Sequence, residues 1–474
     1  MSVMKSLHPF IALCGLAAVT PLAYSADAAT AETIAATLRD KALHGDSTAL
    51  DFVSELTTRI GPRPAGSPSE LAAAQWAEKK LEALGFENVR IESFPITAWV
   101  RGAERAEIVA PAPQPMTAAS LGGAPPTPPG GIEGEVVPFA TLEALRAAAP
   151  GSLAGKIAMI TFHMPRTQDG SGYGYATNGR GFGPIEAAKR GAVGFIIRSV
   201  ATGGHRFAHA GATRYADGRV PIPAFAISEP DGDQIERLMH LGEKVRVKLT
   251  SAATYVPSSS SYNVSGEIRG TTRANEVIVL GAHLDSWDLG TGAIDDAAGC
   301  AIITAAARLA REAPRKPQRT IRVVLYGSEE ITQPTDVRQG NRTYAESHRA
   351  DLPLHVAAGE SDFGADRVYA VALTKGALES PFGQTLLRVL APLSIVGSPS
   401  APQGGSDVGP LGAAGVPLFD LKQDGTKYFD YHHTADDTLD KIEPGALSQN
   451  VAAWTALAWL VADSDVDFRA LAAH

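Results

Sequence analysis

The sequence has little cysteine, no cluster of basic residues and, beyond its N-terminus, no long apolar run. Of the two cysteines, Cys14 lies in an N-terminal segment that we expect to be removed, so Cys300 alone remains and an intramolecular disulfide is excluded. We expect Cys300 to be a small buried hydrophobe. The net charge of -9 and the lack of a Lys/Arg run exclude nucleic acid as the main partner. The 45% hydrophobic content indicates a folded chain.

The N-terminus has the order of features found in a secretory signal. Lys5 supplies a positive charge, residues 10–23 are almost entirely apolar, and small residues follow at 23–26. An anchor helix is the alternative, but the apolar run is shorter than the roughly 18 residues needed to span a bilayer. We therefore expect residues 1–25 to be a signal peptide. The protein is then exported to the periplasm or the extracellular medium, with no membrane span after cleavage.

The composition of the remaining chain changes twice, near residue 101 and near residue 258. Residues 26–100 show helical patterns followed by a strand, and Ser67-Pro68 opens one helix with a capping residue and an early proline. Residues 101–257 begin with a stretch rich in Pro and Gly and continue as short strands and helices, which indicates a boundary near residue 101. A polar serine run at 258–261 marks the second boundary.

Residues 258–474 follow a β–α–β pattern. The run 277–280 is continuously apolar, as expected of a parallel strand covered on both faces; a helix at 296–311 and a strand at 321–326 follow. Further strands are predicted near 354–357 and 416–421, and a last helix near 447–463. The pattern predicts an α/β fold, a mostly parallel sheet with helices on both faces. Ligands of such sheets bind beyond the carboxyl ends of the strands.

Polar clusters stand where the chain should reach that edge. His283 and Asp285 follow the first strand, the doublet Asp295-Asp296 precedes the helix, and Glu329-Glu330 follows the second strand. Asp362 follows the third strand, and His432-His433 stands near the C-terminus. Alone, each cluster is more typical of a charged turn or a helix cap. Together they predict a metal site, because imidazole and carboxylate are, with the cysteine thiolate, the groups that bind zinc in proteins.

This ligand set suits two metal ions. We expect Asp295 to bridge them, His283 and Asp362 to bind one, and His433 and Glu330 to bind the other. Asp296 and His432 stay open as alternatives within their doublets.

The residues next to the ligands have different expected roles. Asp285 is expected to accept the second ring N–H of His283 and so to fix the ring. Glu329 is expected to be the general base that takes a proton from water and passes it to the leaving amine.

These segments resemble the zinc peptidases of family M28, most closely the subgroup of plasma glutamate carboxypeptidase, also called carboxypeptidase Q. The matching segments are His283 to Asp288 with Asp295-Asp296, Glu329-Glu330, Glu360 to Asp362, and His433 with Asp437-Thr438. The resemblance implies a zinc aminopeptidase-like (phosphorylase/hydrolase-like) fold, two Zn²⁺ per chain, the same residue roles and a homodimer. Residues 101–257 resemble a protease-associated domain inserted into a peptidase domain made of 26–100 and 258–474.

The expected activity is hydrolysis of small peptides or dipeptides with a free N-terminus. Carboxypeptidase action, a single-zinc glutaminyl cyclase and a non-catalytic peptidase-like binding protein are the alternatives.

Two segments leave questions open. The loop 331–340 is longer than the short Gly-rich loop usual in the family, which makes the substrate preference of relatives a poor guide. Asp407 lies in a stretch that resembles one near the substrate, and a functional role or a capping role is equally expected.

Overall fold

The computed structural model describes residues 26–215, 219–333 and 339–472. The expected signal peptide, residues 1–25, lies outside this part of the chain, as does most of the loop after Ile331. None of the helices in the described ranges combines the length and the apolar surface needed to cross a bilayer.

A five-stranded mixed sheet forms the centre of the molecule, with the order β1-β10-β12-β11-β13. Its strands are β1 (Glu87–Val100), β10 (Thr254–Ile268), β11 (Arg273–His283), β12 (Arg319–Tyr326) and β13 (His355–Glu360). Three strands predicted from the sequence, β12, β11 and β13, pair in parallel, whereas β1 pairs antiparallel with β10 and β10 pairs antiparallel with β12. The carboxyl ends of the parallel strands therefore meet at one edge.

Helices cover both faces of this sheet, which confirms the predicted α/β class. Ile278 and Leu280 of β11 belong to a core that also contains α7 (Ala298–Arg311) and α12 (Pro444–Asp463). The alternate residues Val277 and Val279 pack on the other face with α8 (Gly340–Ser347) and α10 (Gly409–Ala413). This double burial explains why the sequence of β11 is apolar without alternation. Cys300 is buried in α7 and free.

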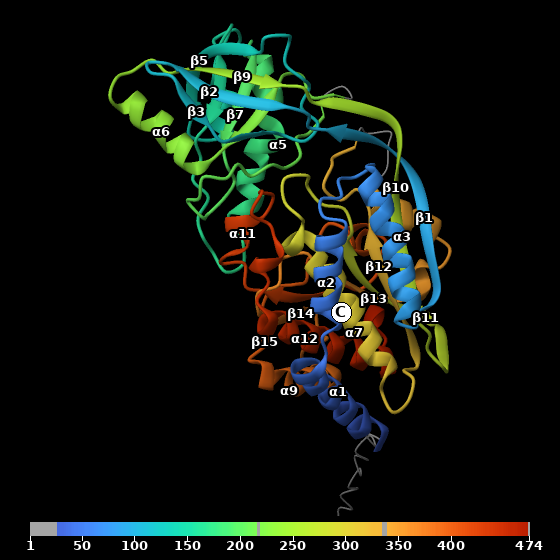
Figure 1. Ribbon diagram of the computed structural model, residues 1–474. Helices are drawn as coiled ribbons and strands as arrows, with labels where there is room; N and C mark the ends of the chain where they lie inside the picture. Colours follow the sequence, from blue (N-terminus) through green and yellow to red (C-terminus); the bar gives the residue numbers. More distant parts are fainter. Residues whose placement is uncertain (1–25, 216–218, 334–338, 473–474) are drawn as a thin grey trace, which may run out of the picture.

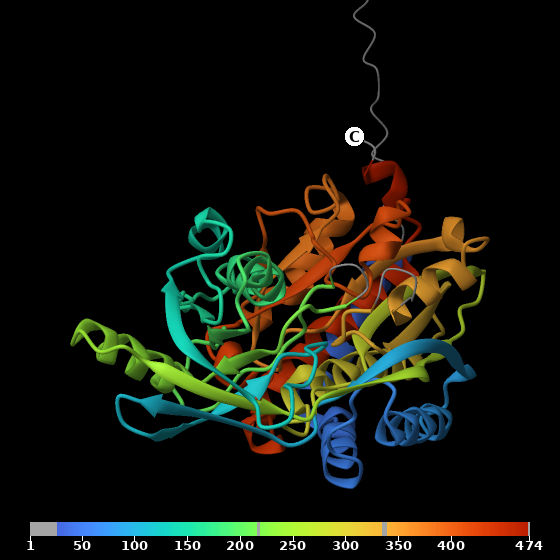
Figure 2. The ribbon, with the colours of Figure 1, turned by 90° about the horizontal axis from the view of Figure 1, so that it is seen from above.

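The chain leaves the central sheet after β1 and returns in β10. Val100 and Thr254, which flank the segment between these two strands, are paired with each other. Residues 104–251 form a second sheet with the order β3-β2-β9-β5-β6-β7-β8-β4. We call this part the 104–251 unit; Figures 1 and 2 show it as a separate lobe beside the central sheet. Its elements are β2 (Glu104–Ala110), β3 (Gln114–Met116), β4 (Ala118–Ser120), β5 (Ile132–Phe139), α4 (Leu142–Ala147), β6 (Ile157–Ile160), α5 (Tyr173–Lys189), β7 (Gly194–Arg198), β8 (Ala224–Ile227), α6 (Glu229–His240) and β9 (Arg246–Ser251).

The remaining elements complete the central part. The strand expected near 416–421 is observed as β16, and it lies in a small three-stranded sheet, order β15-β14-β16, rather than in the central one. These strands are β14 (Val368–Leu373), β15 (Val396–Gly397) and β16 (Phe419–Gln423). The other helices are α1 (Ala26–Gly45), α2 (Thr48–Arg59), α3 (Pro68–Ala83), α9 (Pro381–Leu390), α11 (Tyr428–Tyr431) and α13 (Phe468–Ala472).

Candidate metal centre

The carboxyl edge of the parallel strands gathers the polar side chains. His283 is the last residue of β11, Glu329 and Glu330 follow β12, and Asp362 follows β13. Asp295 lies in a short helical turn, Ala293–Ala297, that leads into α7, and His433 follows α11. Parallel strands with α/β connections thus deliver the predicted residues to one place from distant parts of the chain.

Asp295 lies at the centre of this group. Its Oδ1 is 3.3 Å from Nε2 of His283, which is also 3.4 Å from Oδ1 of Asp362. Its Oδ2 is 3.2 Å from Nε2 of His433, which is also 3.1 Å from Oε2 of Glu330. The two oxygens of one carboxylate therefore face two separate histidine–carboxylate pairs.

The donor atoms fit metal ions rather than hydrogen bonds. Nδ1 of His283 lies 2.9 Å from the carbonyl of Asp285, and Nδ1 of His433 lies 3.2 Å from the carbonyl of Ala210. A carbonyl only accepts, so each Nδ1 carries the proton and each Nε2 turns a lone pair toward the carboxylates. Within the described residues, Asp295 Oδ2, Glu330 Oε1 and Asp362 Oδ1 have no hydrogen-bond donor. Lone pairs that converge in a buried place need a cation.

The electrostatics of the site point the same way. Burial raises the pKa of Glu330 to about 8, and the nearby charge of Asp295 adds to the effect. Burial also raises the pKa of Glu329. Carboxyl groups this close disfavour each other's ionisation, and a metal ion would remove that penalty.

The structure separates the members of the two doublets. Both carboxylate oxygens of Asp296 accept backbone N–H groups, from His283 at 3.1 Å and from Gly299 at 3.0 Å, so Asp296 organises the turn below the site. The ring of His432 stacks on that of His433 at 3.5 Å, and its Nε2 is 3.7 Å from Asp295. Asp295 and His433 thus have the closer contacts to the other candidate ligands.

Asp285 and Glu329 lie directly beside the candidate ligands. The carbonyl of Asp285, rather than its carboxylate, faces the ring of His283; the carboxylate oxygen is 3.9 Å from Nδ1. The carboxylate instead accepts the backbone N–H groups of Glu329 at 3.1 Å and Glu330 at 3.3 Å. Asp285 therefore fixes the backbone of the Glu329-Glu330 doublet. Ser406 donates to Oε1 of Glu329 at 2.6 Å.

Two further residues hold the backbone of the site, and one of them, Arg63, was not foreseen from the sequence. Arg63 is fully buried and donates to the carbonyls of Leu284, Thr291 and Gly292, which fixes the loop between His283 and Asp295. The carboxylate of Asp437 accepts the N–H groups of Ala293 and Ile294. No local pattern identifies such a distant arginine, whereas Asp437 was visible as part of the last matching segment.

Asp407 is buried behind the third segment. Its backbone N–H donates to the carboxylate of Glu360 at 2.6 Å, and burial raises the pKa of its own carboxyl group well above the ordinary value. Asp407 thus contacts Glu360, two residues before the candidate ligand Asp362, through its backbone N–H.

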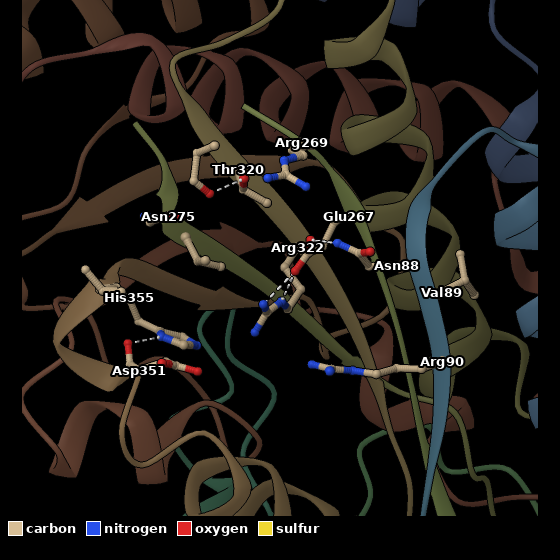
Figure 3. A pocket seen from close by; sticks show the side chains of 13 residues that line it. Asn88, Val89, Arg90, Glu267, Arg269, Asn275, Thr320, Arg322, Asp351 and His355 are labelled. Atoms are coloured by element: carbon tan, nitrogen blue, oxygen red, sulfur yellow. Dashed lines mark hydrogen bonds and ion pairs between the residues drawn. The ribbon is translucent and has the colours of Figure 1, made fainter. Parts of the chain in front are cut away.

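Two cavities differ in their relation to this site. One of about 240 Å³ is lined by Glu360, Asp362 and Ser406, so it opens beside the candidate ligands. A second, of about 640 Å³, lies where β11 and β12 begin and is lined by Asn275 and Thr320 (Figure 3). Since His283 ends β11, the second cavity lies at the opposite edge of the sheet and contains none of the predicted site residues.

The chain is similar to known peptidases over most of its length. The profile of Peptidase family M28 matches residues 263–458. Carboxypeptidase Q of Mus musculus is 33% identical over 410 residues, 86% of this chain and 84% of the relative. The crystal structure of a peptidase M28 precursor from Shewanella amazonensis SB2B superposes with a TM-score of 0.89 at 45% identity, covering 93% of this chain and 98% of that one. A zinc aminopeptidase from Bacillus subtilis, 18% identical over 88% of this chain and 95% of its own, shares the fold with a TM-score of 0.61.

Proposed function

Because the chain belongs to peptidase family M28 and is a zinc metallopeptidase, we propose that it holds two zinc ions and removes residues from small peptides with a free N-terminus. The observation that carries the proposal is the position of Asp295. Each of its carboxylate oxygens faces a different histidine, His283 or His433, and each histidine faces a further carboxylate. A bridging carboxylate with this surrounding is what a two-metal hydrolytic site requires.

The residues of the chain then have defined tasks. His283, Asp362 and Asp295 would hold one zinc ion, and His433, Glu330 and Asp295 the other. Bound zinc supplies a Lewis acid for the peptide carbonyl and lowers the pKa of water.

Glu329 takes the proton from the attacking water and gives it to the leaving amine. Its pKa is raised above the ordinary value, first by burial, which makes the carboxylate a stronger base than an exposed glutamate. Ser406, bonded to Oε1, orients the carboxylate, while Asp285 holds the backbone below it.

The organisation of the chain belongs to the same proposal. We infer that residues 101–257 are an inserted domain containing the 104–251 unit, and that 26–100 and 258–474 make up the peptidase domain. The pairing of Val100 with Thr254 supports this, because an insertion needs its two ends side by side. Export after removal of residues 1–25 and assembly as a homodimer stay predictions.

The direction of cleavage has a specific competitor. The curated relatives are named carboxypeptidases, whereas solved structures of the same fold are named aminopeptidases. A panel of dipeptides, each in free and N-acetylated form, separates the two. We expect zinc-dependent cleavage of the free forms only; cleavage of the blocked forms would establish carboxypeptidase action.

The role of Glu329 is tested by Glu329→Gln, with Glu312→Gln on the surface as the matched control. A general base contributes about 10²- to 10⁴-fold, so kcat of Glu329→Gln should fall by that factor while the zinc content, measured by elemental analysis, stays at the wild-type value. Glu312→Gln should match wild type in both. A fully active Glu329→Gln enzyme would rule out this base, and a wild-type protein that binds one zinc would rule out the two-metal site.

A further inference from the structure

We propose that the 104–251 unit is a part of the metal centre, because the carbonyl of Ala210 orients the ligand His433 and Arg180 holds that carbonyl in place. The inference rests on the proposed two-zinc site. It assigns Arg180, a residue of helix α5, as a positioning residue for one of the two metal ions and not for the other.

The two histidine ligands differ in what holds their rings. The Nδ1 of His283 donates to the carbonyl of Asp285, two residues along the same loop. The Nδ1 of His433 donates instead to the carbonyl of Ala210, 223 residues away in the 104–251 unit. The Ala210 N–H donates back to the carbonyl of His433 at 3.0 Å, so the contact is reciprocal. The ring N–H partner of a metal-bound histidine sets its tautomer and orientation.

The backbone of His433 makes this support more important. Its φ is +63°, in the left-handed region that residues with a Cβ adopt at a cost. The segment just before it is also held by the unit, since the Thr202 N–H donates to the carbonyl of Phe429 at 3.2 Å. Arg166 makes a two-pronged ion pair with Asp430, at 2.7 and 3.0 Å. The unit thus fixes the chain on the N-terminal side of His433 as well as its ring.

Arg180 connects the Ala210 carbonyl to the rest of the unit. Its NH1 donates to Ala210 O at 3.4 Å, its NH2 donates to the hydroxyl of Tyr173 at 3.2 Å, and its guanidinium lies 5.6 Å from the centre of the Tyr173 ring. Only 8% of Arg180 is exposed, and among the described residues no carboxylate pairs with it. A buried cation without a counter-charge is costly, which indicates that its planar set of donors has a task at this position.

Gly211 shows how closely the guanidinium approaches this backbone. A Cβ at Gly211 would lie 2.2 Å from Cζ of Arg180, and φ of Gly211 is +140°. Only glycine leaves room for the guanidinium against the Ala210–Gly211 peptide.

The two metal ions should therefore respond differently when Arg180 is changed. Loss of a residue that orients a ligand typically lowers metal affinity about 10- to 100-fold. The His433 ion should show that loss, and the His283 ion should not, because its histidine is oriented from within its own loop.

The experiment is a competition of zinc-loaded protein against a chelator, with released zinc measured per chain for wild type, Arg180→Met and Arg190→Met. Arg190 is the matched control, since it caps the C-terminal end of the same helix and, among the described residues, its bonds to Glu186 and to the carbonyls of Arg146 and Ala148 stay within the unit. We expect one zinc of Arg180→Met to be released at about 10- to 100-fold lower chelator concentration, the second at the wild-type value. Arg190→Met should match wild type for both.

A second variant guards against simple misfolding. Gly211→Ala keeps the guanidinium but pushes it from the peptide, and it should show the same selective release of one zinc. Release of both ions together, or unchanged affinity of both in Arg180→Met and Gly211→Ala, would overturn the inference. A wild-type protein with a single zinc would instead overturn the proposed two-metal site, so the two failures are distinguishable.

Discussion

Substitution of Asp285 by asparagine tests how the candidate metal centre holds the proposed base, Glu329. Asp285 is fully buried, and its two oxygens accept the N–H groups of Glu329 and Glu330 at 3.1 and 3.3 Å. Asparagine keeps one acceptor and turns an NH₂ group toward the other amide. One hydrogen bond to a charged acceptor is then lost, at about 1.5 to 3 kcal/mol. We expect the free energy of unfolding of Asp285→Asn to fall by about 2 kcal/mol.

Activity should fall by more than this stability loss alone would cause, because the displaced amides belong to the proposed base, Glu329, and to the proposed metal ligand, Glu330. Loss of a residue that supports metal ligands lowers metal affinity or activity about 10- to 100-fold. We therefore expect kcat/KM of Asp285→Asn to drop by about that factor and its affinity for zinc to be lower. The assays are dipeptide hydrolysis, zinc release to a chelator and urea unfolding.

Glu443→Gln is the matched control for this prediction. Glu443 also accepts two backbone N–H groups, from Gly445 and Ala446, but it caps α12 outside the metal site. It should lower stability and leave kcat/KM unchanged. An Asp285→Asn enzyme with wild-type kcat/KM and zinc affinity would refute the reasoning.

Further predictions concern other parts of the molecule. Burial lowers the pKa of His355 to about 4. The neutral ring therefore contributes about 3 kcal/mol of stability above pH 6.5, and this contribution is lost as the pH falls toward 4. The free energy of unfolding of His355→Gln in urea should depend less on pH over this range, and an unchanged dependence would contradict the assignment. Arg63→Met leaves the carbonyls of Leu284, Thr291 and Gly292 without their donor and should lower the free energy of unfolding by about 3 kcal/mol; a loss below about 1 kcal/mol in urea unfolding would argue against this role. Removal of zinc should lower Tm, and Tm should rise again with each addition of zinc, because the ion binds only the folded site; a Tm independent of zinc would speak against a metal at Asp295.

The parts of the fold that follow from local sequence were predictable. The apolar run at 277–280 is observed inside β11, because a strand covered on both faces needs continuous apolar residues, and the strand predicted at 321–326 is observed inside β12. Ser67 caps α3 as its sequence indicated, since its side chain accepts the N–H of Glu70 at 3.1 Å. These signals lie within a few residues of one another.

The contacts that support the site were harder to foresee. The role of Asp285 depends on which of its oxygens faces His283, and a carbonyl and a carboxylate of one residue cannot be told apart by spacing. The contact of Ala210 uses a backbone atom, which leaves no mark on the residue type. The small sheet that contains β16 was missed because a short strand carries no information on which sheet it joins.

The pairing of β1 with β10 has a consequence for how the chain reaches its native state. Val100 meets Thr254 only if the intervening segment, residues 101–253, is folded back on itself. Closing such a long flexible loop is entropically unfavourable, by about 0.6 kcal/mol for each doubling of its length. If the 104–251 unit collapses first, its ends arrive together, and the effective loop shortens by roughly five doublings, worth about 3 kcal/mol. The order of events in synthesis agrees with this, because the unit leaves the ribosome before β10 does. Slow or failed collapse of this one unit would therefore delay the central sheet as well.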